Sequence, residues 1–165
     1  MKARDKYILA AVAALVLLPL IVSQSEPMTA AQLIASFEGF RAHPYWDVNR
    51  YSWGYGTPAP GATGTITKEQ ALAELQQHSA ADLQYLQPLI TRPLNANQWA
   101  ALLSFAYNEG SGNADNLVNN INAGDDQALA DQWRLYNKAR DAAGNLVYSQ
   151  TLADRREKEL QTWFA

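Results

Sequence analysis

Residues 38–57, EGFRAHPYWDVNRYSWGYGT, carry the strongest chemical and conformational signals in this chain of 165 residues. The stretch holds two carboxylates, Glu38 and Asp47, nine positions apart, followed by aromatic residues and glycines. Aromatic sequence punctuated by glycine predicts a small sheet or hairpin between Tyr45 and Tyr55. Two carboxylates at this spacing are common by chance, so the spacing alone does not establish an active site.

The sequence before this stretch predicts a helix that ends at the first carboxylate. Thr29 and Gln32 form a capping-box pattern, and apolar side chains follow at helical spacing to predict an amphipathic helix over residues 29–38, stopped by Gly39. Glu38 would then lie at the negative end of the helix dipole, where we expect its pKa to rise, as a general acid at neutral pH requires.

The second carboxylate is expected to behave differently. Asp47 precedes a predicted turn at residues 48–51 and should stay solvated and ionised. One protonated and one ionised carboxylate is the arrangement that glycoside hydrolysis requires. The hydroxyl of Ser52 could orient a water molecule. In a strand, Tyr51, Trp53 and Tyr55 would share the opposite face, so we expect them to pack in the interior if Ser52 faces a cleft.

Helices dominate the rest of the predicted structure. A loop is expected over residues 56–65. Capping boxes at Thr67 with Gln70 and at Asn95 with Gln98 predict a long helix to about Leu86 and a further apolar helix. The remaining predicted elements are a glycine turn at 108–113, short helices at 115–125 and 126–140, a loop at 141–150 and a last helix at 151–163.

Composition and charge exclude several kinds of function. The formal net charge is −3, and it is −5 when residues 1–25 are set aside. A mildly acidic domain lacks the basic surface on which nucleic-acid binding depends. The absence of cysteine excludes disulfides, thiolate metal sites and a cysteine nucleophile. His43 and His78 are expected to be at the surface or partly buried rather than to act as metal ligands.

The first 25 residues resemble an export signal rather than part of the domain at 26–165. A basic head is followed by 17 uncharged residues, Tyr7 to Ser23. A helix of that length spans about 25 Å, close to the lower limit for crossing a bilayer, and the basic head would stay cytoplasmic. Both a signal peptide cut before Glu26 and an uncleaved anchor remain open. Either predicts a periplasmic domain.

Several motifs in order resemble the phage-type lysozymes, or endolysins. The family pattern is Glu, eight residues, Asp, a Thr after about five more, and a Gly-x-Gly hairpin, here Gly54 and Gly56. This chain has Ser52 after only four residues, and Thr57 where the family usually has His. Downstream, QWAALLSFAYNEGSGN and TLADRREKEL resemble further family motifs, so the resemblance spans residues 29–163.

The resemblance implies an α+β fold of the lysozyme type. A small N-terminal lobe with a β-hairpin or sheet and a larger helical C-terminal lobe would be joined by a long helix and preceded by the N-terminal apolar helix. It also implies hydrolysis of the β-1,4 bond between N-acetylmuramic acid and N-acetylglucosamine in peptidoglycan, with no metal or other cofactor. Glu38 would protonate the leaving oxygen, while Asp47 stabilises positive charge and, with Ser52, holds the attacking water.

Other residues are assigned by the same resemblance. Trp46, Thr57 and Asn108 would bind substrate. Arg156 is expected to face Glu38, with an intrahelical pair to Glu159 as the alternative.

The apolar N-terminal run resembles a signal-anchor-release segment. The enzyme would be tethered in the host inner membrane through residues 7–23, then released as a monomer into the periplasm. A lytic transglycosylase and a non-catalytic, membrane-anchored wall-binding protein are the alternative functions.

Overall fold

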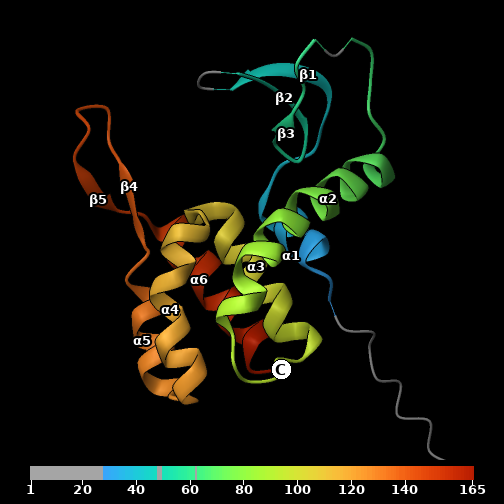
Figure 1. The fold of residues 1–165 in the computed structure, drawn as a ribbon. Helices are drawn as coiled ribbons and strands as arrows, with labels where there is room; N and C mark the ends of the chain where they lie inside the picture. Colours follow the sequence, from blue (N-terminus) through green and yellow to red (C-terminus); the bar gives the residue numbers. More distant parts are fainter. Residues whose placement is uncertain (1–27, 48–49, 62) are drawn as a thin grey trace, which may run out of the picture.

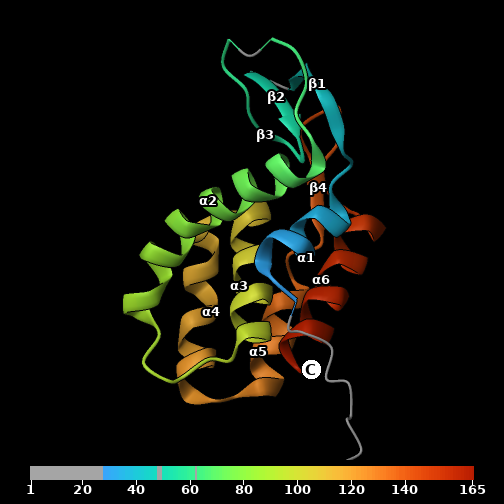
Figure 2. The same cartoon turned by 90° about the vertical axis from the view of Figure 1, so that its right-hand side faces the viewer.

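A computed structural model describes residues 28–47, 50–61 and 63–165 as an α+β protein with two lobes (Figure 1). A small sheet forms one lobe, helices form the other, and one long helix runs between them (Figure 2). This confirms the two-lobed α+β architecture, with a long connecting helix, that was expected from the sequence. The apolar helix predicted within residues 1–25 lies outside the described residues. Across the described ranges, no helix has the length and apolar character needed to cross a membrane.

The first helix, α1 (Ala30–Phe37), forms for the local reasons predicted. The Thr29 side chain accepts a hydrogen bond from the backbone of Gln32, and the Gln32 side chain accepts one from the backbone of Thr29. Leu33 and Ile34 are fully buried on its inner face. The helix therefore has a fixed start and a fixed orientation, which together determine where its C-terminal end points.

The sheet is antiparallel and consists of β1 (Arg41–Asp47), β2 (Arg50–Gly54) and β3 (Thr57–Pro58), with β2 in the centre. Register pairs Tyr45 with Ser52 and Asp47 with Arg50, and the pairing is irregular between Arg41 and Tyr45. The turn expected at residues 48–51 lies partly outside the described residues. The predicted hairpin is confirmed, with a third short strand added at the predicted loop.

Helix α2 (Lys68–Leu86) connects the lobes and continues into a short 3₁₀ helix, η1 (Gln87–Leu89). Its capping box at Thr67 is formed as predicted. Ala71 and Leu75 pack into a small core beneath the sheet, whereas Leu86 belongs to the larger core of the helical lobe. One helix thus contributes to both cores.

The helical lobe contains α3 (Ala96–Glu109), α4 (Ser111–Ala123), α5 (Asp126–Arg134) and α6 (Gln150–Trp163). Helix α3 is its central element and contacts α1, α2, α4 and α6. The Phe105 ring meets Trp133 edge-on, and Trp133 packs against Trp163, so three helices share one aromatic core.

The segment between α5 and α6 differs from the prediction. The helix expected over 126–140 ends at Arg134, and a hairpin, β4 (Lys138–Arg140) and β5 (Leu146–Tyr148), replaces part of that helix and part of the predicted loop. The carboxylate of Asp141 accepts backbone hydrogen bonds from Ala143 and Asn145, which closes the turn. Both strands are exposed along their whole length, so no alternating burial pattern marked them in the sequence.

Candidate active site

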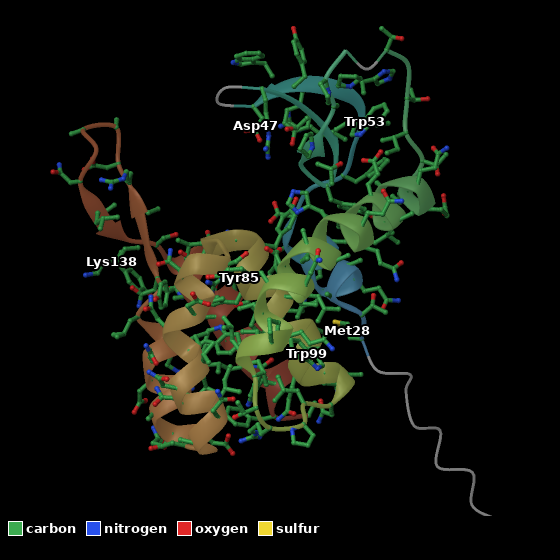
Figure 3. The ribbon with its side chains drawn as sticks, in the orientation of Figure 1. Met28, Asp47, Trp53, Tyr85, Trp99 and Lys138 are labelled. Carbon is green, nitrogen blue, oxygen red and sulfur yellow. The ribbon has the colours of Figure 1, made fainter. Side chains whose placement is uncertain are left out.

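An open cleft of about 530 Å³ lies between the sheet and the helices. Both predicted carboxylates, Glu38 and Asp47, line it. The other lining residues come from the sheet lobe and from α2 and α3: Gly39, Arg41, Tyr45, Arg50, Tyr55, Gly56, His78 and Tyr107. Figure 3 shows Asp47 in the sheet lobe, well separated from Lys138 on the β4–β5 hairpin. The fold therefore brings the two carboxylates, Glu38 and Asp47, to one concave surface.

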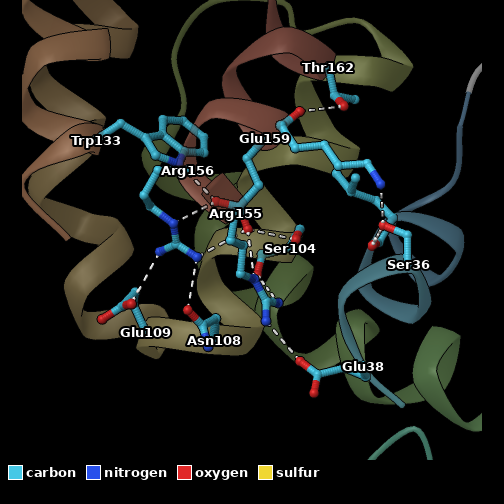
Figure 4. Close-up of polar contacts among 12 residues, drawn as sticks. Ser36, Glu38, Ser104, Asn108, Glu109, Trp133, Arg155, Arg156, Glu159 and Thr162 are labelled. Atoms are coloured by element: carbon cyan, nitrogen blue, oxygen red, sulfur yellow. Dashed lines mark hydrogen bonds and ion pairs between the residues drawn. The ribbon is translucent and has the colours of Figure 1, made fainter. Parts of the chain in front are cut away.

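Glu38 is the residue at which α1 ends. Its backbone N–H still donates to the carbonyl of Ile34, but its own backbone is extended, which turns the chain away from the helix axis. The side chain is 31% exposed, and its Oε1 atom accepts a hydrogen bond of 2.8 Å from Arg155 Nη1 (Figure 4). Glu38 is thus held on one side by a cation and is open to the cleft on the other.

The partner of Glu38 is Arg155, and the prediction that Arg156 would face it is wrong. Successive residues of a helix point about 100° apart, so the two arginines of α6 leave the helix in different directions. Arg156 pairs with Glu159 three residues on, which was the alternative prediction, and also with Glu109 at 3.2 Å. Both arginines are buried. A division of the helix into an apolar inner face and a polar outer face therefore does not tell which of the two points toward Glu38.

Burial affects the charges around Arg156. Removal from water lowers the pKa of Arg156, which the carboxylates of Glu159 and Glu109 oppose. Burial likewise raises the pKa of Glu109, against the attraction of Arg156. Arg156 of α6 and Glu109 at the end of α3 thus form an ion pair, and neither residue lines the cleft.

Asp47 ends β1, at the end of the strand that leads into the turn, and is half-buried. Its register partner on β2 is Arg50, which also lines the cleft. A strand end, rather than a helix end, therefore presents the second carboxylate. The two acids come from different elements and meet different neighbours.

The hydroxyl residues of the hairpin are buried instead of lining the cleft. Ser52 is completely buried in the central strand, and within the described part of the chain its Oγ atom has no hydrogen-bond partner. Thr57 is also buried and donates a 2.7 Å hydrogen bond to Glu74 Oε2, which Trp53 Nε1 also contacts at 2.9 Å. This differs from the expectation that Ser52 faces the cleft and Thr57 binds substrate, because Thr57 instead ties the sheet to α2.

The predicted substrate-binding residues Trp46 and Asn108 also lie outside the cleft lining. The Trp46 side chain is 62% exposed and meets the ring of Tyr51 edge-on at 5.3 Å. Both Tyr51 and Tyr55 were expected to pack in the interior. Tyr55 is buried, but Tyr51 is exposed. Asn108 is exposed, and its Oδ1 atom accepts a hydrogen bond from Arg156 Nη2.

In residues 28–47, 50–61 and 63–165, no group of three or more His, Cys, Asp or Glu side chains is arranged to hold a metal ion.

Comparison with known proteins is consistent with this geometry. The family model for phage lysozyme matches residues 35–159. The chain belongs to the phage lysozyme family. The resemblance predicted from the motifs of residues 29–163 is confirmed at the level of the family.

The curated relatives that this chain matches are endolysins. The chain is 33% identical over 134 residues to an endolysin of Bacillus phage B103, with 77% of this chain and 49% of the relative covered. An endolysin of Acyrthosiphon pisum secondary endosymbiont phage 1 is 31% identical, and 89% of its length is covered. The chain spans about half the length of the Bacillus phage relatives that it matches.

Solved structures of the same fold include a bacterial and a phage protein. The muramidase domain of SpmX from Asticaccaulis excentricus superposes with a TM-score of 0.74 at 26% identity, covering 82% of this chain and 95% of that domain. An endolysin from Escherichia coli O157:H7 phage FAHEc1 gives a TM-score of 0.73 at 26% identity, covering 85% and 94%.

Sequence reasoning on this family member missed several cleft residues. Tyr107 donates a hydrogen bond to the carbonyl of Tyr55, and burial raises its pKa to about 12, to which the negative charge of Glu38 adds. His78 meets the Tyr107 ring edge-on at 5.5 Å. Arg41 stacks over the ring of Tyr45, at 4.3 Å from its centroid. None has a local sequence signal, because tertiary contacts between separate elements bring them together.

Proposed function

We propose that this chain is a peptidoglycan-degrading endolysin that hydrolyses the β-1,4 bond between N-acetylmuramic acid and N-acetylglucosamine. The observation that carries the proposal is that Glu38 and Asp47, from a helix end and a strand end, line one open cleft in a phage lysozyme. Paired carboxylates across an open, polar cleft suit the cleavage of a glycan chain. The printed names of its relatives, endolysin and muramidase domain, agree with this activity.

The chemistry follows from the two acids. Glu38 acts as the general acid and gives its proton to the leaving glycosidic oxygen. The carboxylate of Asp47, at the strand end, stabilises the positive charge that develops on the sugar ring. Asp47 also holds the attacking water, a role in which Ser52 takes no part because its side chain is completely buried and does not line the cleft. Arg155 fixes the Glu38 carboxylate from behind.

Replacing Glu38 with glutamine tests the proposal. Glu38→Gln keeps the side-chain size but removes the acidic proton, so hydrolysis of dye-labelled peptidoglycan by the full chain should be abolished. Circular dichroism should show an intact fold. The matched control is Glu69→Gln, an exposed change in the first turn of α2, which should keep wild-type activity. Persisting hydrolysis in Glu38→Gln would show that Glu38 is not the acid.

The same assay separates the alternative reactions. Hydrolysis leaves reducing ends on the products, whereas a lytic transglycosylase leaves 1,6-anhydro ends, and mass spectrometry distinguishes them. We expect reducing ends because Asp47 is present beside the acid. A wild-type chain that binds peptidoglycan without cleaving it would instead support a non-catalytic wall-binding protein.

We also propose that residues 7–23 tether the enzyme to the host inner membrane until it is released into the periplasm. The support is the uncharged run of 17 residues behind a basic head. Mass spectrometry of the periplasmic protein tests this. A chain beginning at Met1 or Lys2 means release of the intact anchor, whereas a chain beginning at Glu26 means cleavage of a signal peptide.

A further inference from the structure

We propose that Glu159, a buried carboxylate of α6, is a positioning residue that aims Arg155 at the acid Glu38. The inference rests on the proposed function, since it concerns the same acid. Glu159 does not line the cleft and would not touch substrate. It would act on catalysis only through Arg155.

The Glu159 carboxylate is completely enclosed and receives donors from several elements (Figure 4). Its Oε1 atom accepts hydrogen bonds from Ser104 Oγ at 2.8 Å and from Arg155 Nε at 3.2 Å. Its Oε2 atom accepts one from Trp133 Nε1 at 3.0 Å. Helices α3 and α5 thereby fix this carboxylate independently of the two arginines.

Arg155 has a separate partner for each part of its guanidinium group. Its Nε donates to Glu159, its Nη2 donates to the carbonyl of Ser104 at 3.4 Å, and its Nη1 donates to Glu38. The group also lies over the ring of Phe37, at 4.6 Å from the centroid. Because a guanidinium is planar, fixing Nε and Nη2 also fixes the direction of Nη1. The position of Nη1 at Glu38 therefore depends on Glu159.

Glu159 also keeps the two neighbouring cations apart. Arg156 Nη2 donates to Oε1 at 3.2 Å, and its Nε lies 3.1 Å from Oε2 without the alignment of a hydrogen bond. Arg156 is then drawn toward Glu109 and Asn108. A single carboxylate between two buried arginines lets Arg155 point toward the cleft while Arg156 points away from it.

A carboxamide cannot replace this carboxylate. Hydrogen-bond donors converge on both oxygens of Glu159, whereas glutamine offers one acceptor oxygen and one NH₂ donor. In either orientation, the NH₂ group of Glu159→Gln faces a donor. With the NH₂ group at the Oε1 position, Arg155 loses the acceptor of its Nε atom. With the NH₂ group at the Oε2 position, it faces Trp133 Nε1, and Arg155 is held only by a neutral amide oxygen in place of a carboxylate. Either way, the hold of residue 159 on Arg155 is weakened, and the guanidinium could rotate away from Glu38.

Kinetics of the full chain on soluble glycan strands of peptidoglycan test the proposal. Glu159→Gln should lower kcat by about 10- to 100-fold with little change in KM, because misplacing a catalytic group by about 1 Å costs up to that factor. Arg155→Met should lower kcat to a similar extent. If Glu159 acts through Arg155, Glu159→Gln lowers kcat no further in the Arg155→Met background.

The matched control is Glu157→Gln, which removes an exposed carboxylate of the same helix and should leave kcat unchanged. Ser104→Ala removes one donor to Glu159 and keeps every charge. It should give a smaller fall in kcat that also disappears in the Arg155→Met background. This variant decides the question if Glu159→Gln does not fold.

Two results would overturn the proposal. The first is that the losses in kcat caused by Glu159→Gln and Arg155→Met multiply in the double variant. The second is that kcat is unchanged in a folded Glu159→Gln protein. If Glu159→Gln does not fold, an unchanged kcat in Ser104→Ala takes the place of this second result. A wild-type chain that cleaves no glycan would refute the proposed function instead, so the two failures are distinguishable.

Discussion

Arg155 and Arg156 show how burial constrains single charged residues. A charged group removed from water needs compensating charges and hydrogen bonds. Arg155 meets Glu38 and Glu159, and Arg156 meets Glu109, Asn108 and Glu159. The two guanidinium groups share Glu159 but otherwise have different acceptors, so the two residues are not interchangeable, although they are adjacent in sequence.

Tyr107 gives a prediction at the same scale. Its pKa is raised to about 12 from an unfolded value of about 10, chiefly by burial. The neutral phenol is favoured in the folded state, so its contribution to stability is complete below pH 10 and is lost between pH 10 and about 12. Absorbance titration at 295 nm should show one tyrosine ionising near pH 12, and this component should be missing in Tyr107→Phe.

A second tyrosine provides the control for that titration. Tyr85 also has a raised pKa, through its hydrogen bond to Asp115, but it is exposed. Tyr85→Phe should therefore leave the component near pH 12 in place. Its disappearance in Tyr85→Phe, or its survival in Tyr107→Phe, would contradict the assignment.

At the scale of elements, the approach of β2 to α2 depends on one glycine. Gly54 has φ +57°, and a Cβ atom added there would lie 2.8 Å from Ala71 Cβ. Neither the strand nor the helix can yield by rotating a side chain. Gly54→Ala should therefore destabilise the fold by about 1–3 kcal/mol through overpacking, with a further cost from the left-handed backbone. Denaturant unfolding monitored by circular dichroism measures this change.

Gly112 in α4 is the matched control. Nothing lies within 4 Å of a Cβ added there, and its backbone is not in the left-handed region. Gly112→Ala should stabilise the protein by about 0.4–1 kcal/mol, because alanine has less conformational freedom in the unfolded chain. Equal losses of stability in the two variants would argue against the proposed contact between Gly54 and Ala71.

The elements also differ in how far their sequences predicted them. Three capping boxes, at Thr29, Thr67 and Asn95, are formed as expected because each lies within four consecutive residues. The β4–β5 hairpin was missed because its strands bury no face and carry no periodic signal. Local hydrogen bonding was predictable, and structure without burial was not.

At the scale of the molecule, the two cores are unequal in size. Among the residues that the structure describes, the core of the helical lobe contains 14 buried residues between Leu86 and Trp163, two of which are tryptophans. Within the same described ranges, the core beneath the sheet contains six buried residues, of which only Tyr55 is aromatic. Since stability grows with the apolar area buried, the sheet lobe should open at lower free energy.

Native-state hydrogen exchange tests this difference. Amides of β2 should exchange through a local opening, before global unfolding, while amides in the middle of α3 should exchange only on global unfolding. Equal exchange free energies in the two elements would mean that both cores unfold together. The result bears on function, because opening of the sheet lobe would move Asp47 relative to Glu38.

The sequence by itself determined the three helix starts that carry capping boxes, the first hairpin, the family and the two carboxylates of the cleft. These signals are local, or they are residue types in a fixed order. The sequence did not determine the start of α4, which begins at Ser111 rather than at residue 115. Only the tertiary structure decided that Arg155 rather than Arg156 meets Glu38, that Ser52 and Thr57 are buried, and that Tyr107 and His78 line the cleft. Those outcomes depend on how α2, α3 and α6 pack against the sheet and α1, and periodicity within a single element carries no information about that packing.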